Sequence, residues 1–256
     1  MSAPIPNYRP LLMLDTNAVH YARLYLVFAD RQTPKLPPFD VAISDVPAAI
    51  DASLPTSNNM RDSLKKGYRL IERLRIRSDA GDAIQYSPVA QAELVSGRLR
   101  GEAILDAATE NIPHRLWNRF DEREILARLE WNTYQRIQAE TDDMDSLFQS
   151  AGIDVNLADP STMTQVWSVA RRVLGCLYLE LGDCAVYASA LLAEADELLS
   201  GDNYFRELVG WVQNPGSAPS SMVAHFTRSN TYLKDIVAEA TNTHVSKIHL
   251  PKAPKW

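Results

Sequence analysis

The apolar positions of the chain follow two patterns. Short apolar runs such as LLML at 11–14, AIQY at 83–86 and ELL at 197–199 are typical of strands in a sheet that is covered on both faces. Longer segments repeat their apolar residues at helical spacing; in 61–77 these are Leu64, Tyr68, Ile71 and Leu74. Strands alternating with helices predict an α/β fold, with a mainly parallel central sheet flanked by helices.

The length of 256 residues, 46% of them hydrophobic, predicts one domain over residues 1–256 with a substantial core. Residues 31–60 carry five prolines, so we expect a loop-rich insertion there. Residues 98–175 read as a helical insertion, which includes the amphipathic segments 117–137 and 161–175.

Two further segments carry local predictions. The acidic sequence TDDMDS at 141–146 lacks the glycine and the ligand residue that a calcium-binding EF-hand loop requires, so it reads as a solvated loop. Near the end of the chain a helix is expected over 230–240, and the alternating run VSKIHL at 245–250 predicts an edge strand.

The net charge of -6 excludes a generally basic surface, so any contact with nucleic acid must come from a local patch. The two cysteines, Cys176 and Cys184, lack a CxxC spacing, and we expect them to be buried thiols. No apolar run is long enough to span a membrane, and no leader pattern is present. These features predict a soluble, cytoplasmic protein without a membrane partner.

Four acids lie where a strand ends or a helix begins: Asp15, Glu93, Asp183 and Asp202. Each alone is explained by a structural role, since Asp favours helix N-caps and turns. The carboxyl ends of parallel strands share one edge of the sheet, however, so all four acids can meet there.

Several carboxylates at one point repel one another by roughly 4 kcal/mol per pair at 4 Å and a dielectric of 20, so they require protons or a cation. Hard oxygen ligands favour Mg²⁺ or Mn²⁺ over Zn²⁺. Such ions activate water for displacement at phosphorus, which predicts cleavage of phosphodiesters.

The sequences LDTNAV, YSPVAQAEL and GDCAVYASALLAEADELLSGDNYF, in this order, resemble the PIN-domain nucleases, many of which are toxins of bacterial toxin and antitoxin pairs. The resemblance covers about a quarter of the chain, and the intervals between its first three acids are longer than in compact members. It implies a three-layer α/β/α fold and a Mg²⁺- or Mn²⁺-dependent endoribonuclease. Asp15, Glu93, Asp183 and Asp202 would be its catalytic metal ligands, with Asn17 and Ser200 as polar helpers. An antitoxin protein and a homodimer are further implied partners.

A basic stripe follows one face of the helix expected at 61–77, and two arginines lie beyond Glu93. Charged helix faces are commonly only solvated, but these side chains are also candidates for contacts to the RNA backbone. The candidates are Lys66, Arg69, Arg73, Arg77, Arg98 and Arg100.

Two other functions compete with the nuclease. A catalytically silent PIN-like module would bind RNA or a protein through the insertions, although such a module has no need to retain all four acids. A phosphatase of the haloacid dehalogenase type also begins with an acid after a buried strand, but it requires a second Asp where this chain has Asn17.

Overall fold

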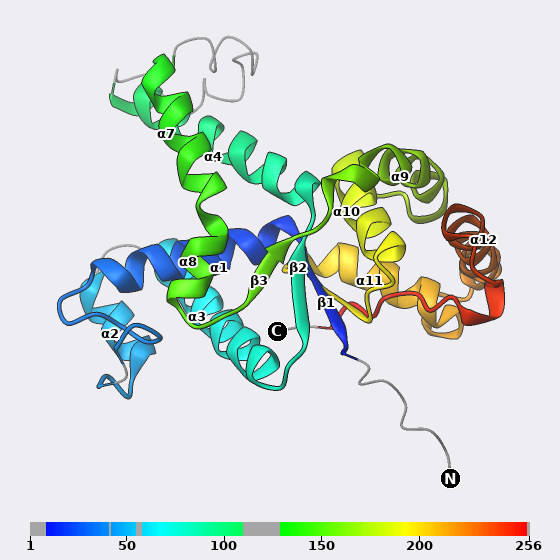
Figure 1. Ribbon diagram of the computed structural model, residues 1–256, viewed down its shortest axis with the longest axis horizontal. Helices are drawn as coiled ribbons and strands as arrows, with labels where there is room; N and C mark the ends of the chain where they lie inside the picture. The colour runs from blue at the N-terminus through cyan, green and yellow to red at the C-terminus, as the bar shows by residue number, and fades with distance from the viewer. Residues whose placement is uncertain (1–8, 41, 55–57, 110–128, 255–256) are drawn as a thin grey trace.

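The computed structural model describes residues 9–40, 42–54, 58–109 and 129–254, with only the backbone described for 104–109. Its centre is a four-stranded, wholly parallel sheet in the order β3-β2-β1-β4, flanked by helices on both faces (Figure 1). The strands are β1 (Leu11–Leu14), β2 (Ala83–Tyr86), β3 (Val155–Leu157) and β4 (Glu197–Leu199). The predicted α/β/α architecture is confirmed.

The position of β1 in the centre of the sheet explains why its sequence, LLML, is an unbroken apolar run. Leu12, Met13 and Leu14 are all fully buried, because β1 pairs with β2 on one side and β4 on the other and has helices above and below. Leu12 and Leu14 belong to the core on one face, and Met13 belongs to the core on the other. Successive side chains of a strand point to opposite faces, so each face requires an apolar residue.

The helices form two layers that divide between these cores. One layer contains α1 (Thr16–Arg31), α2 (Val46–Ser53), α3 (Asn58–Asp79) and α8 (Met144–Ser150). The other contains α9 (Met163–Leu177), α10 (Leu181–Leu192), α11 (Asn203–Gln213) and α12 (Val223–Thr241).

Helix α3 lies unusually close to α1, and Gly67 permits this. A Cβ atom at position 67 would overlap the backbone carbonyl oxygen of Tyr21 and crowd the Cβ of Tyr25 at 2.7 Å. Backbone atoms cannot move aside cheaply, so any larger residue would push the two helices apart. The close approach brings the basic side chains of α3 next to Tyr21.

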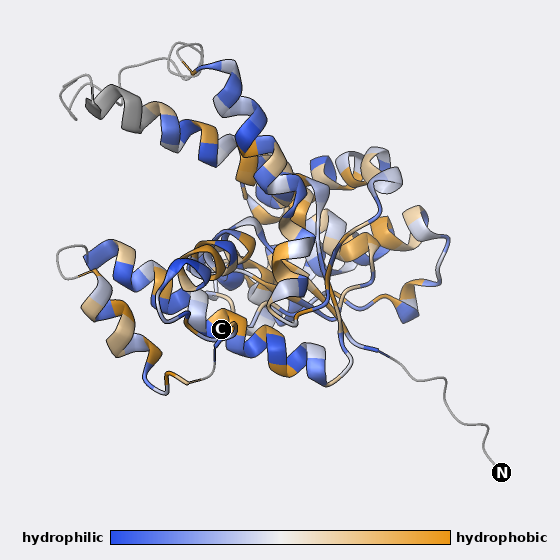
Figure 2. Cartoon of the chain, turned by 60° about the vertical axis from the view of Figure 1, so that its left-hand side comes forward, coloured by the Kyte–Doolittle hydropathy of each residue, from blue (hydrophilic) through white to orange (hydrophobic). Residues whose placement is uncertain are grey.

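Helix α4 (Pro88–Thr109) begins as predicted, with Ser87 as its N-cap: the Ser87 Oγ accepts a hydrogen bond from the Ala90 amide at 3.0 Å. With α7 (Trp131–Asp142) it forms an arm that projects away from the sheet and carries many hydrophilic residues (Figure 2). Much of the predicted segment 117–137 lies outside the described residues.

Two predictions for the middle of the chain were wrong. The segment 98–175 is not purely a helical insertion, because β3 within it is the outer strand of the sheet. Strand β3 has only three residues, which is too few for its sequence pattern to be distinguished from that of a loop. TDDMDS is not a solvated loop, since Asp142 ends α7 and Asp145 lies in α8, where it accepts a 2.8 Å hydrogen bond from the Tyr86 hydroxyl.

The prediction for 245–250 was also wrong. Val245–Lys247 form a 3-10 turn whose N-cap, His244, accepts a hydrogen bond from the Ser246 amide. The pairing to β4 comes two residues after the predicted strand, at Lys252, whose amide donates to the Asp196 carbonyl at 2.8 Å. The loop-rich segment 31–60 contains the short helix α2, and its end forms the start of α3.

Both cysteines are free and buried, as expected. In the described ranges, no single helix has the length and apolar character needed to cross a membrane; Pro160–Leu177 and Leu181–Leu192 reach it only when taken together across a bend of 114°.

Candidate functional site

The strand order places a crevice between the ends of β1 and β4. From β1 the chain proceeds outward to β2 and then β3, after which β4 returns to the other side of β1. Where the order reverses in an open parallel sheet, the connections leave the carboxyl ends of the two strands in opposite directions, and ligands bind in the gap. Asp15 follows β1 and Ser200 follows β4 at this point.

Asp15 is held rigidly at this edge. Its side chain is only 3% exposed, and its Oδ1 accepts a hydrogen bond from the Thr16 amide at 2.6 Å, which caps α1. Its Oδ2 accepts another from the Ser200 hydroxyl at 2.6 Å. Burial raises the pKa of Asp15 to about 6, even though these hydrogen bonds act in the opposite direction. The predicted role of Asp15 as a helix cap is confirmed.

Glu93 reaches the same edge from the second turn of α4. Its Oε2 accepts a hydrogen bond from the hydroxyl of Thr16. Its carboxylate lies against the start of α10, where a Cβ atom at position 182 would overlap Oε1. Gly182 therefore provides the room that the Glu93 carboxylate occupies beside Asp183.

Asp183 lies in the first turn of α10, three residues after the N-cap Glu180, so it is not the N-cap itself. Burial, and after it the charges of Asp15, Glu93, Asp202 and Glu180, together raise the pKa of Asp183 to about 7. The chain thus brings Asp183 into the electrostatic range of the other three acids. A carboxyl with this pKa is partly protonated at neutral pH.

Asp202 and Ser200 connect the end of β4 to the site. The Oδ1 of Asp202 caps α11 by accepting hydrogen bonds from the amides of Tyr204 at 2.7 Å and Phe205 at 3.2 Å. The Asp202 amide donates to the Ser200 hydroxyl at 3.1 Å, and Ser200 in turn donates to Asp15. Ser200 is 1% exposed and so serves as a fixed link between two of the predicted acids.

The four acids share a further property: in the described part of the chain none of them forms an ion pair with Lys, Arg or His, whereas acids elsewhere do. Hydroxyl or amide groups instead donate hydrogen bonds to the carboxylates of Asp15, Glu93 and Asp202. Among the same described residues, no three His, Cys, Asp or Glu side chains are already arranged as ligands around one point. The charges of the four acids affect one another, but in the described residues their carboxylates are not positioned as a preformed metal site.

A basic pocket of about 240 Å³ adjoins the acids through Ser200. Lys66 and Arg69 enter it from α3, Tyr21 from α1, and Asn203 and Arg206 from the start of α11. The Lys66 ammonium lies over the Tyr21 ring, 5.4 Å from its centroid. Lys66, Arg69 and Arg206 thus line a pocket next to the four acids, and none of the three forms an ion pair with these acids.

The predicted basic stripe therefore divides into two halves. Lys66 and Arg69 line the pocket near the acids. Arg73 and Arg77 lie near the opposite edge of the sheet, where each pairs with Glu197, at 3.5 and 3.1 Å, and Arg77 also pairs with Asp82. These two arginines pair with acids at the amino ends of the strands and lie outside the site, so the prediction that they contact RNA beside the acids was wrong.

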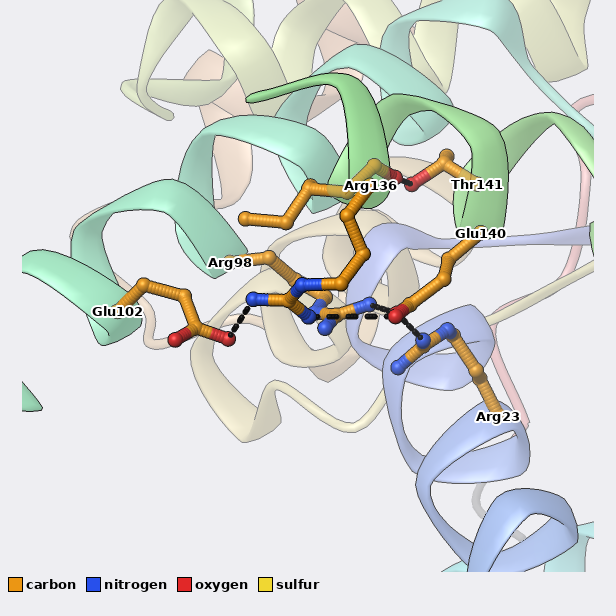
Figure 3. Close-up of polar contacts among 7 residues, drawn as sticks. Arg23, Arg98, Glu102, Arg136, Glu140 and Thr141 are labelled. Atoms are coloured by element: carbon orange, nitrogen blue, oxygen red, sulfur yellow. Dashed lines mark hydrogen bonds and ion pairs between the residues drawn. The ribbon is translucent and has the colours of Figure 1, made fainter. Parts of the chain in front are cut away.

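Arg98 belongs to an ion-pair network that attaches the arm to the body (Figure 3). Glu140 of α7 pairs with Arg98 of α4, with Arg23 of α1 at 2.7 Å and with Arg136 at 3.2 Å. Burial alone would raise the pKa of Glu140, but the arginines lower it. Arg98 is therefore a structural residue here, and Arg100 also has an interaction partner.

Three residues were missed by the sequence argument or given no role. Thr16 binds two of the acids, by its amide and its hydroxyl, and its only sequence signal is its place directly after a strand-end Asp. Gly182 directly precedes Asp183, and Arg206 follows Asp202 by four residues, but nothing in the sequence indicated which residues they contact. Asn17 is exposed and forms no hydrogen bond to the four described carboxylates.

Comparison with models of protein families, with curated proteins and with solved structures finds no match to this chain.

Proposed function

We propose that this protein is a metal-dependent endoribonuclease whose site is the acid cluster formed by Asp15, Glu93, Asp183 and Asp202. The observation that carries the proposal is the coupling of these acids, from four segments of the chain, without a cationic partner among the described residues. Natural folds neutralise buried carboxylates unless their charge has a use.

The donor set fits a hard divalent cation. The four carboxylates offer the oxygen ligands that Mg²⁺ and Mn²⁺ favour, and Gly182 leaves space for the carboxylate of Glu93 beside Asp183. Because the oxygens now accept hydrogen bonds from Thr16 and Ser200, ion binding would involve some exchange of these bonds. A bound ion would supply electrophilic stabilisation of a phosphate and activation of water at neutral pH.

The chain's own residues have distinct tasks in this proposal. Ser200 and the Thr16 amide orient the Asp15 carboxylate, while Asp183, with a pKa of about 7, is partly protonated at neutral pH and would bind a cation in its ionised form. Lys66, Arg69 and Arg206 bind phosphates of the RNA backbone in the adjoining pocket. Such contacts position a strand without reading its sequence.

The assay incubates the purified protein with mixed single-stranded RNAs, with and without Mn²⁺ or Mg²⁺. We expect metal-dependent cleavage that is lost in Asp15→Asn and in Asp183→Asn. Glu197→Gln serves as a matched control, because it removes one carboxylate at the opposite edge of the sheet. A parallel reaction with a DNA strand of the same sequence shows whether cleavage requires the ribose 2′-hydroxyl.

One observation favours a second function, a silent module that binds RNA or a protein. The carboxylates of Asp15, Glu93 and Asp202 accept hydrogen bonds from protein donors, and the four acids are not preassembled as ligands among the described residues. In the same assay, tight binding of RNA that remains intact with either metal would establish this module and contradict the nuclease.

The proposal also concerns location and partners. A cytoplasmic location suits an RNA substrate and two free cysteines. If the protein is a toxin, it has an antitoxin protein as a partner and a homodimer as its expected assembly. A small gene directly beside this one would support the toxin role.

A further inference from the structure

A second basic surface lies between α9 and α12, away from the residues assigned above. Arg171, Arg172 and Gly175 from the last turns of α9, with His225, Arg228 and Tyr232 of α12, line an open pocket of about 430 Å³. Arg172 pairs with Glu239 at 2.7 Å, whereas Arg171 and Arg228 have no ion-pair partner among the described residues. Two arginines are thus available to an anionic ligand on a chain of net charge -6.

An exposed aromatic ring lies beside this pocket in an unusual backbone conformation. Tyr178, the residue that ends α9, has φ 54° and ψ 31°, in the left-handed region. Glycine or asparagine is the usual residue there, because a bulky side chain is strained. Burial does not explain the choice of tyrosine, since its side chain is 62% exposed.

The ring of Tyr178 is held in place by its neighbour. It stacks on the His225 ring, with the centroids 5.1 Å apart and the planes inclined by 24°. His225 is itself fixed by a 2.8 Å hydrogen bond from Nε2 to the Cys176 carbonyl. One face of Tyr178 is therefore supported from below, which makes a preformed flat platform at the edge of an arginine pocket.

The platform lies close to the acids along the chain. Tyr178 precedes Asp183 by only five residues, and five residues in full extension span at most about 18 Å. A strand bound at the acids would therefore reach Tyr178 within a few nucleotides.

We propose that Tyr178 and the adjacent arginine pocket bind single-stranded RNA, with a base stacked on Tyr178 and phosphates against Arg171 and Arg228. Cations combined with exposed rings are the means by which proteins hold single strands. The inference specifies the substrate of the proposed function as an extended single strand, and so it rests on that function. An acidic protein would use the arginines but has no need of the ring.

The test measures binding of a labelled single-stranded RNA of about 20 nucleotides in EDTA, so that cleavage plays no part. Tyr178→Asn removes the ring but suits the left-handed backbone, whereas Tyr178→Phe keeps the ring. We expect Tyr178→Asn to weaken binding on the order of tenfold with a Tm no lower than that of the wild type, and Tyr178→Phe to bind as the wild type does. Wild-type affinity in Tyr178→Asn would overturn the proposal.

The arginines are tested by salt dependence. Arg171→Gln with Arg228→Gln should reduce the slope of log Kd against log salt by roughly 1.4, the loss of two phosphate contacts to a single strand. The matched control, Lys35→Gln with Arg75→Gln, removes the same charge outside both pockets and should leave the slope unchanged. An unchanged slope in the arginine variant overturns the proposal.

Two outcomes separate this inference from its alternatives. If polyglutamate displaces RNA and its own binding depends on Arg171 and Arg228 but not on Tyr178, the surface serves an acidic protein and the inference fails. If the wild type cleaves nothing with Mn²⁺ while the variants still weaken RNA binding as expected, the RNA surface stands and the nuclease function fails.

Discussion

At the amino edge of the central sheet, Asp82 and Glu197 both lie against Arg77, whereas at the carboxyl edge Asp15 and Asp183 have no cationic partner in the described part of the chain. The consequences for protonation are opposite. Burial alone would lower the pKa of Arg77, but Asp82 and Glu197 raise it, so its charge is secured. At the carboxyl edge burial and neighbouring acids raise the pKa values of Asp15 and Asp183.

The difference shows which edge is built for stability. An acid paired with arginine stabilises the fold at neutral pH, while an acid whose pKa is raised makes the folded state less stable there. The chain has arginines available, as the amino edge and the network around Glu140 show. At the described carboxyl edge Arg69 and Arg206 line the adjoining pocket, but neither forms an ion pair with the four acids, so these acids do not stabilise the fold as the paired acids do.

The largest expected effect comes from Gly182→Ala. The added Cβ displaces the flexible end of Glu93, which costs little stability but moves one carboxylate out of the cluster. Misplacement by about 1 Å can lower a rate by roughly a hundredfold, so we expect such a loss in RNA cleavage with the Tm nearly unchanged. Gly210→Ala, in open space on α11, is the matched control. Full activity in Gly182→Ala would show that Glu93 is dispensable.

Metal binding should depend steeply on pH at the carboxyl edge. Asp15 and Asp183, with pKa values of about 6 and 7, must lose their protons before they bind a cation. Between pH 5.5 and 8 we therefore expect the affinity for Mn²⁺ to rise by roughly a hundredfold, measured by calorimetry. Asp183→Asn should remove most of this dependence. An affinity that does not change with pH would contradict a site at these two acids.

The two edges should respond oppositely when an acid is neutralised. The pKa of Asp15 is raised from 3.8 to about 6, so its contribution to stability is complete below pH 3.8 and is lost as the pH rises through 6. Asp15→Asn should therefore raise the free energy of unfolding by about 2 kcal/mol at pH 8 and by much less at pH 4.

Glu197→Gln is the counterpart at the amino edge, and it should lower the free energy of unfolding by about 1 kcal/mol at pH 8. Urea unfolding at both pH values measures each change. If both variants lose stability at pH 8, the contrast between the edges is wrong.

The smallest expected effect is a difference in RNA binding between the two halves of the basic stripe of α3. Lys66→Gln with Arg69→Gln should weaken RNA binding and reduce its salt slope by roughly 1.4, because both side chains line the pocket beside the acids. Arg73→Gln with Arg77→Gln removes the same charge from the same helix but breaks the pairs with Glu197. The Arg73 and Arg77 variant should lower the Tm and leave the salt slope unchanged. Equal slopes in the two variants would show that the two halves of the stripe do not differ in their contacts to RNA.

The sequence predicted those parts of the fold whose signals are local. LLML followed by Asp15, Ser87 followed by Pro88, and the alanine-rich helix after Asp183 each determine their own structure, and all were confirmed. The three residues of β3 carry no such signal, because their strand depends on β2 beside them. VSKIHL alternates like a strand, but His244 starts a turn there and Lys252 occupies the edge of β4 instead.

The candidate site shows the same division. A parallel sheet has one carboxyl edge, so the expectation of parallel strands alone predicted the approach of Asp15 and Asp202. The partners of these acids depend on side-chain geometry across distant segments, as in the contact of Thr16 with Glu93. The division of the basic stripe also required the structure, since only the length of α3 relative to the sheet decides which arginines reach Glu197.

The pairing of Lys252 with β4 bears on how the molecule avoids joining other sheets. It occupies the outer side of β4, where the Leu198 amide donates to the Lys252 carbonyl at 2.6 Å. In the described chain, β3 is then the strand whose outer side no other strand covers, and it is short, with an exposed Asn156 beside an exposed Asp154. Short, polar edges resist intermolecular strand addition. Deleting the residues after Leu250 would unmask the apolar β4 and favour aggregation.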